Sequence, residues 1–176
     1  MNGISAFGAY VPQMRLERSA IATAHGWLVP ALKGRGKGAR ALADWDEDSV
    51  TLAVEAARSA LPDEDRSQLD SLVFASTTSP FDLRLNAGIV AAALDLDTNT
   101  SCHDAAGSER AGLSALIAAL KVPGECTLIT AADRLRPKAA STAEIETGHA
   151  GAAMVVSSNN VAAAYLGHAS QTEDFV

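Results

Sequence analysis

The sequence predicts an α/β fold, because strand-like apolar runs alternate with helical patterns through most of its 176 residues. Pro, Gly and polar turn residues separate these elements. Alternation of this kind implies right-handed crossovers and helices on both faces of a sheet. We therefore expect a layered αβα arrangement, with a mixed, mostly parallel five-stranded sheet around a buried helix. The strand-like runs cover residues 4–11, 69–76, 100–105, 126–132, 148–157 and 161–169.

Composition restricts the classes of function. The chain is long enough for one domain with a core, over residues 1–176. A net charge of −7 argues against a general nucleic-acid partner or an anionic membrane surface. No apolar run approaches the length of a membrane span, and the N-terminus lacks a signal-peptide pattern. Cys102 and Cys126 lie in apolar runs, which predicts buried, free thiols in a reducing cytoplasm. The four histidines lack ligand spacing, so we expect no metal site.

The first half of the chain holds three expected helices. The first, over residues 18–32, is interrupted at Pro30. The second, over residues 49–61, follows an acidic run that offsets the helix dipole, and the third covers residues 86–94. Gly8 lies inside the first strand, where a glycine predicts a close approach of another backbone.

Residues 101–120 form the centre of the predicted architecture. The strand over 100–105 ends at Gly107 and Ser108, and an alanine- and leucine-rich helix follows. Ser108 is a good N-cap, since its hydroxyl can accept a free N–H of the first turn. This helix has no polar face, so we expect it to be buried all round. Its N-terminus stabilises negative charge, which suits a reactive site beside Glu109.

The segment 33–40 contains the basic cluster of the chain, with Lys33, Arg35, Lys37 and Arg40 spaced by glycines. Free backbone N–H groups among four cations suit a phosphate. The segment lacks the P-loop pattern and does not follow a strand, so a nucleotide-binding module ranks last among the functions considered. A glycine-rich basic segment of this kind is more often a solvated surface loop than a phosphate site, and we favour that interpretation. The last two strands, 148–157 and 161–169, predict an antiparallel hairpin at a sheet edge.

Five segments in order resemble the thiolase superfamily, especially 3-hydroxy-3-methylglutaryl-CoA synthase and ketoacyl synthase III. They match the opening strand, an early helix, the nucleophile segment with Asp104 and Gly112 as anchors, and two later strands. The resemblance covers the N-terminal one of the family's two similar halves. The segments are Gly3 to Pro12, Asp46 to Ala57, Asp104 to Leu116, Ile129 to Asp133 and Gly148 to Val156.

This resemblance implies a cytoplasmic acyltransferase that condenses acyl-CoA substrates and holds no bound cofactor. The family's nucleophilic cysteine falls at Glu109, where a mixed anhydride would hydrolyse easily. Glu109 is then expected to orient substrate, to act as a base or to promote decarboxylation. Arg110 would hold a carboxylate or CoA, and Lys33, Arg35, Lys37 and Arg40 would contact CoA phosphates. His149 replaces a usual acid and is interpreted as a partly buried histidine that bonds to nearby backbone.

A second hypothesis is a non-catalytic thiolase-like subunit or scaffold that supports an active partner, because the cysteine and the second half are both missing. Glu109 is then a helix-dipole acid, ion-paired with Arg110 or a loop arginine. The half alone is expected to be inactive. The resemblance further implies a homodimer through the strand near Thr100–Ala105, with a second thiolase half or an OB-fold acyl-CoA-associated protein as further partners.

Overall fold

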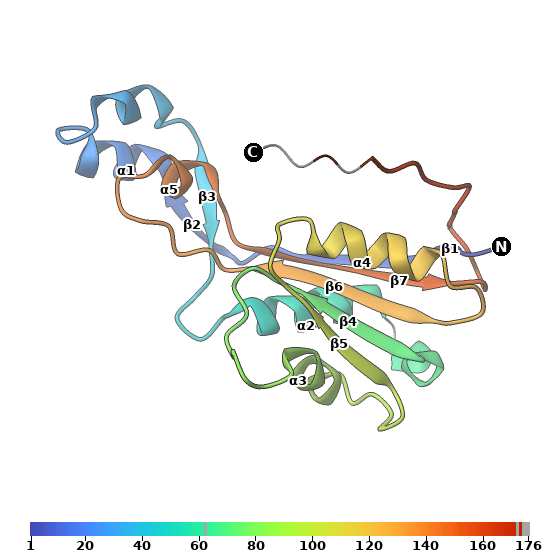
Figure 1. The fold of residues 1–176 in the computed structure, drawn as a ribbon. Coiled ribbons are helices and arrows are strands. Elements are labelled where there is room, and N and C mark those ends of the chain that lie inside the picture. Colours follow the sequence, from blue (N-terminus) through green and yellow to red (C-terminus); the bar gives the residue numbers. More distant parts are fainter. Residues whose placement is uncertain (62, 172, 174–176) are drawn as a thin grey trace.

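A computed structural model describes residues 1–61, 63–171 and 173, without the side chains of 63–65. Its centre is a six-stranded sheet with helices on both faces, so the predicted α/β class and the αβα layers are confirmed (Figure 1). Helix α4, Ala111–Leu120, covers one face. Helices α2, Ser49–Ala60, and α3, Asn86–Ala93, cover the other.

The sheet is mixed, in the order β5-β4-β6-β7-β1-β8. Strand β4 pairs parallel with β5 and β6, whereas β7 pairs antiparallel with β6 and β1. Strands β1, β4, β5 and β6 therefore share one direction, as a mostly parallel sheet requires. The sheet has one strand more than the five expected. The bounds are β1 Gly3–Tyr10, β4 Ser71–Ala75, β5 Ser101–Ala105, β6 Thr127–Asp133, β7 Ala150–Ser157 and β8 Ala163–Ala164.

The predicted hairpin between the last two strands is wrong. Strand β8 has only two residues and pairs antiparallel with β1, so β1 lies between β7 and β8. The chain leaves β7 through Asn160, which has a positive φ of 50°, and crosses the edge of β1. Local alternation cannot reveal this, because the paired residues of β1 and β8 are 159 and 161 positions apart in the sequence.

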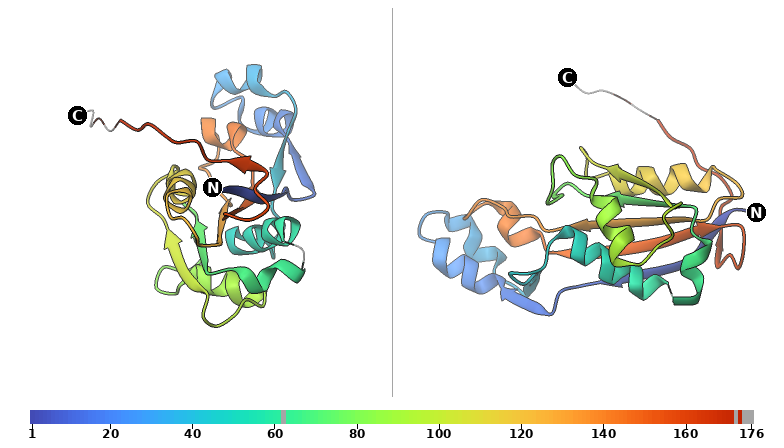
Figure 2. Two further views of the ribbon diagram at one scale, coloured as in Figure 1. Left: turned by 90° about the vertical axis from the view of Figure 1, so that its right-hand side faces the viewer. Right: turned by 90° about the horizontal axis from the view of Figure 1, so that it is seen from below.

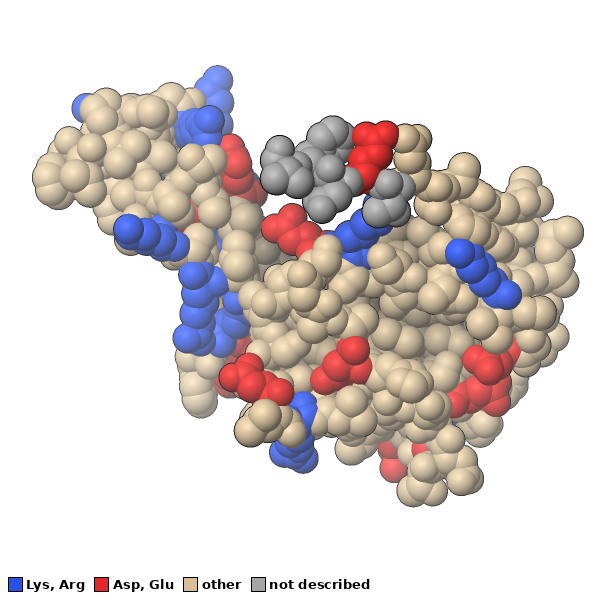
Figure 3. Space-filling view, viewed as in Figure 1, with Lys and Arg blue, Asp and Glu red and all other residues tan. Residues whose placement is uncertain are grey.

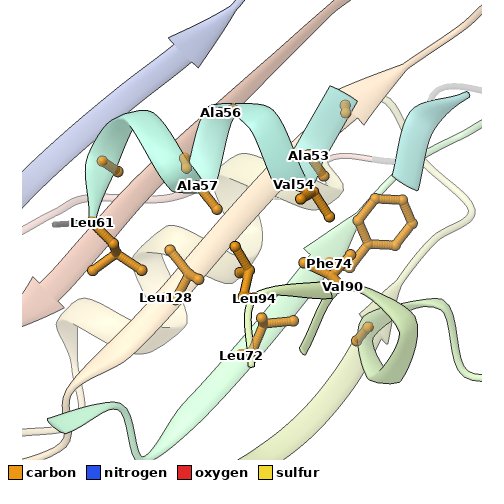
Figure 4. Close-up of a cluster of buried hydrophobic side chains, with 14 of the residues drawn as sticks. Ala53, Val54, Ala56, Ala57, Leu61, Leu72, Phe74, Val90, Leu94 and Leu128 are labelled. Carbon is orange, nitrogen blue, oxygen red and sulfur yellow. The ribbon is translucent and has the colours of Figure 1, made fainter. Parts of the chain in front are cut away.

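Helix α2 is the buried helix of the molecule. Asp48 caps it in a capping box with Thr51, and eight of its twelve residues are buried. The backbone of α2 lies directly on strands β1 and β7. A Cβ built on Gly8 of β1 would fall 2.4 Å from the Ala56 carbonyl oxygen, and one built on Gly151 of β7 would fall 2.3 Å from the Leu52 carbonyl oxygen. The close approach predicted at Gly8 is confirmed. Figure 4 shows the core that α2 and α3 form with the sheet around Leu72, Phe74, Val90, Leu94 and Leu128.

Helix α4 is not buried all round, contrary to the prediction. Only Ala111 is buried, and Leu113 is 52% exposed. The helix packs one side on β4, β5, β6 and β7, while the other side faces outward in Figure 2. The apolar pattern predicted a second covering layer that the described residues do not supply. The amide of Asn2 donates to the carbonyls of Ala119, Leu120 and Val122 at the C-terminal end of the helix.

A smaller part projects from one end of the sheet (Figure 1). It contains strands β2, Met14–Glu17, and β3, Ala39–Leu42, which form a separate two-stranded sheet that the sequence did not predict. Helices α1, Arg18–His25, and α5, Thr142–Glu146, pack with the 3₁₀ helix η1, Pro30–Arg35, around Ile21, Leu32 and Ile145. A second 3₁₀ helix, η2, covers Asp63–Gln68.

The predicted helix over 18–32 is divided into α1 and η1, as Pro30 indicated. The basic segment 33–40 is part helix and part strand, so its interpretation as a loop holds only between η1 and β3. Within the described part of the chain, no helix combines the length and apolarity needed to cross a membrane.

Candidate functional site

The site lies at the carboxyl ends of the parallel strands β4, β5 and β6, which meet at one edge of the sheet. Between β5 and α4 the chain turns through Gly107, whose φ of +86° favours glycine. The Ser108 hydroxyl accepts the Arg110 N–H at 3.1 Å, and the Ser108 carbonyl accepts the Ala111 N–H at 3.0 Å. Ser108 therefore organises a turn that precedes the helix. The predicted N-cap is wrong, because the N-cap of α4 is Arg110, two residues after Ser108, and its side chain forms no capping bond.

An apolar cavity of about 310 Å³ lies between the start of α4 and the sheet. Gly112 lets the helix approach closely, since a Cβ there would lie 3.0 Å from the Ala131 Cβ. Glu109, Ser108, Thr77, Ser76 and Asp133 are the polar members of the lining. The other members are Ala75, Ala111, Gly112, Leu113, Leu116, Ile129, Ala131, Ala152, Ala153 and Met154.

Glu109 is an exposed residue on the wall of this cavity. Its carboxylate forms no hydrogen bond or ion pair with any residue that the structure describes. The ion pair with Arg110 that a helix-dipole role suggested is therefore absent from the described residues. Arg110 is exposed and lines neither this cavity nor the hollow beside it.

Asp133 anchors the polar wall of the cavity from the end of β6. Its Oδ1 accepts the Thr77 N–H at 2.8 Å and three hydroxyl groups. These are Ser76 at 3.1 Å, Thr77 at 3.0 Å and Thr78 at 3.0 Å. The loop after β4 is thus held to the end of β6. Sequence analysis missed this group, although polar residues that follow two neighbouring parallel strands were a usable signal.

Asp104 has a structural task beside the site. Its carboxylate accepts the N–H groups of Asn86 at 2.9 Å and Ala87 at 2.7 Å, which are the first N–H groups of α3. The Asn86 side-chain amide donates to it at 3.0 Å. Asp104 thus joins the end of β5 to the start of α3 and fixes the chain five residues before Glu109.

The basic residues lie on the projecting part. Arg35 pairs with Glu146 at 2.8 Å, and Lys33 and Lys37 line a surface hollow of about 630 Å³ with Gly34 and Gly36. Arg40 is only 4% exposed and donates to the Glu144 carbonyl at 2.7 Å. Of the four basic residues, Lys33, Arg35 and Lys37 are therefore the ones with exposed side chains. Figure 3 shows Lys and Arg gathered over the projecting part and its junction with the sheet.

His149 is bonded to the backbone, as interpreted from the sequence, and it is fully buried where partial burial was expected. Its Nδ1 accepts the Ala43 N–H at 2.9 Å, so its Nε2–H donates to the Leu135 carbonyl at 2.9 Å. Burial lowers the pKa of His149, and the positive charges of Arg40, Arg134 and Arg136 lower it further. The ring is therefore a neutral structural bridge and is absent from the cavity lining.

Cys102 and Cys126 are both partly buried, which differs from the full burial predicted. The Cys102 Sγ lies 3.6 Å from the Thr100 carbonyl oxygen. Burial raises the pKa of the Cys102 thiol, and the Asp104 charge raises it further. A thiol with a raised pKa is a poor nucleophile at neutral pH. Neither cysteine lines the cavity. No group of residues suited to holding a metal ion occurs in the part of the chain that the structure describes.

Comparisons of the sequence find relatives of about twice its length. No family model matches the chain. A hydroxymethylglutaryl-CoA synthase of Methanocella arvoryzae is 32% identical over 164 residues, which cover 90% of this chain and 47% of that protein. A hydroxymethylglutaryl-CoA synthase of Pyrococcus furiosus is 29% identical over 184 residues, which cover 98% of this chain and 51% of that protein. The chain therefore spans about half the length of these curated relatives.

Solved structures share the fold. A hydroxymethylglutaryl-CoA synthase crystallised with CoA matches with a TM-score of 0.78 and 23% identity, over 90% of this chain and 42% of that one. The priming β-ketosynthase of the R1128 polyketide pathway matches with a TM-score of 0.76 and 21% identity, over 92% of this chain and 51% of that one. At these identities the matches establish a thiolase-like fold.

Proposed function

The chain is a thiolase-like relative of hydroxymethylglutaryl-CoA synthases, and we propose that it forms the N-terminal half of a condensing enzyme that handles acyl-CoA. The observation that carries this proposal is the cavity at the start of α4, with Glu109 on its wall. The resemblance implies that the nucleophile of the family occupies this place. An apolar cavity with a few polar groups at one side suits an acyl group.

In this proposal Glu109 contacts the acyl group, while Asp133 positions Ser76 and Thr77 at the cavity wall. Ser76 and Thr77 donate their hydroxyl hydrogens to Asp133, and a carboxylate has no hydrogen to donate. These groups therefore shape the polar wall of the cavity, and none of them replaces a thiolate. Cys102 does not supply the thiolate either, since its pKa is raised and it lies outside the cavity. We therefore expect no covalent acyl intermediate on the unmodified chain.

Restoring a thiol tests the position. We expect Glu109→Cys to react with acetyl-CoA, because a thiol at a helix N-terminus has a lowered pKa. The introduced thiolate attacks the thioester carbonyl, the acetyl group moves to sulfur, and CoA leaves as its thiol. Intact-mass spectrometry should show one acetyl group on this variant and none on the unmodified chain or on Glu109→Ala. An adduct on Cys102 of the unmodified chain would overturn the assignment of the position to Glu109.

Binding of the CoA phosphates is assigned to the basic segment in the same proposal. Lys33 and Lys37 border a hollow together with Gly34 and Gly36, and Arg35 is exposed beside them. Replacing Lys33, Arg35 and Lys37 together by alanine should weaken CoA binding in calorimetry. Arg40→Ala should instead lower stability, because Arg40 is buried against Glu144. Unchanged CoA binding in the triple variant would remove this segment from the site.

A non-catalytic subunit is the second candidate, favoured by the unpaired Glu109 in place of a thiol. Strand β5 is a sheet edge, and a groove of about 620 Å³ separates it from α4. We propose that a second copy pairs there, and that a second thiolase half or an OB-fold partner completes the site. Sedimentation of the purified chain tests the dimer. Turnover of acyl-CoA by the chain without any partner would exclude the scaffold role.

A further inference from the structure

The charged groups of the cavity are all acidic. Among the residues of its lining, Glu109 and Asp133 are the only ionisable ones, and no Lys, Arg or His is present. A second hollow of about 470 Å³ shares Ser76, Thr77, Ser108 and Glu109 with the cavity and adds Asp82. A ligand that enters through this side therefore meets carboxylates and hydroxyl groups, with no cation in either lining.

The two carboxylates of the cavity differ in their bonding. Oδ1 of Asp133 already accepts four donors, from Ser76, Thr77 and Thr78. Glu109 accepts none among the described residues. The N-terminal end of α4 would attract an anion. Glu109 places a negative charge of this chain at that end, so a second anion gains no attraction there.

The size and polarity of the cavity limit the acyl group. A volume of about 310 Å³ is at the small end for ligand sites. Beyond the polar wall the lining is formed by alanine, leucine, isoleucine and methionine side chains. A carboxylate placed among them would lose hydration without gaining a cation or a free donor.

We infer that this cavity takes short, uncharged acyl groups and rejects those that end in a carboxylate, with Glu109 as the residue that determines this specificity. The inference rests on the proposed function and names the substrate class of the same site. It also narrows the roles considered for Glu109. A residue that repels carboxylates is suited to orienting a neutral acyl group and not to promoting the decarboxylation of a malonyl-type group.

Butyryl-CoA and succinyl-CoA test the inference, because their acyl groups have the same number of carbon atoms and differ in a methyl or a carboxylate end. Calorimetry at fixed ionic strength gives the dissociation constant of each for the purified chain. We expect succinyl-CoA to bind at least tenfold more weakly than butyryl-CoA, a difference of about 1.4 kcal/mol. Glu109→Gln should reduce this ratio to about threefold or less, since it frees the helix N-terminus.

Asp46→Asn is the matched control. It removes one negative charge from an exposed acid that lines neither hollow, so the ratio should stay as in the unmodified chain. Equal or tighter binding of succinyl-CoA to the unmodified chain would overturn the inference and leave acyl-CoA handling intact. A ratio unchanged in Glu109→Gln would overturn the role of Glu109. Failure of both thioesters to bind would overturn the proposed function and the inference with it.

Discussion

The contact between α2 and β7 predicts that Gly151→Ala destabilises the fold. A Cβ at Gly151 would fall 2.3 Å from the Leu52 carbonyl oxygen and 2.7 Å from its carbon. Ordinary contact begins near 3.4 Å, so the helix backbone must retreat by about 1 Å. Both atoms belong to the backbone of α2, in which eight of the twelve residues are buried, so no flexible side chain can move aside. Overpacking of this kind costs about 1–3 kcal/mol.

Urea unfolding followed by circular dichroism measures this cost. With a slope of about 2 kcal/mol per molar urea, a loss of 2 kcal/mol lowers the midpoint by about 1 M. The same loss lowers Tm by about 4–8 °C for a chain of this size. Gly34→Ala is the matched control, since a Cβ there meets nothing within 4 Å. Its midpoint should stay equal or rise slightly, because alanine restricts the unfolded chain. Equal midpoints for the two variants would refute the tight packing of α2 on β7.

Three further predictions concern titration and capping. The lowered pKa of His149 means that the unfolded chain binds more protons below pH 6.5, so stability is full above that pH and falls as the pH decreases; urea midpoints at pH 7.5 and 5.5 should differ more for the unmodified chain than for His149→Gln. The hydrogen bond from Tyr10 to Glu47, 2.5 Å long, raises the pKa of Tyr10 to about 12. The substitution Glu47→Gln should return this pKa toward 10, which absorbance titration of the phenol measures. Removing the cap of α3 by Asp104→Ala should cost about 1–2 kcal/mol in urea unfolding, whereas the exposed Asp82→Ala should cost almost nothing.

Local patterns predicted those elements whose own residues determine them. The helix over 49–61 was found because its acidic start and apolar face are both local. One acid of that run, Asp48, caps the helix, which the sequence analysis did not predict. The strand over 126–132 was found because a central strand is apolar on both faces. Strands β2 and β3 were missed, since four residues such as Met-Arg-Leu-Glu carry no recognisable alternation. Their pairing depends on the opposite strand, which is 22 residues away between Glu17 and Ala39 and 28 residues away between Met14 and Leu42.

The burial of α4 was predicted incorrectly for a related reason. An apolar pattern shows that a helix can be covered, but it does not say which element covers it. Here the sheet covers one side, and Leu113 remains 52% exposed on the other. In the proposed function a second thiolase half or a second copy of the chain supplies the missing layer. The exposed apolar side of α4 is then buried only in the assembly.

The position of the candidate site followed from topology, whereas its chemistry depends on contacts that the sequence does not display. Residues after parallel strands meet at one edge of the sheet, so Thr77, Glu109 and Asp133 had to be neighbours once the strand order was known. The strand order does not say that Asp133 accepts four donors while Glu109 accepts none. That difference depends on side-chain geometry between residues 56 positions apart, Thr77 and Asp133. The role proposed for Glu109 in selecting uncharged acyl groups depends on the same difference.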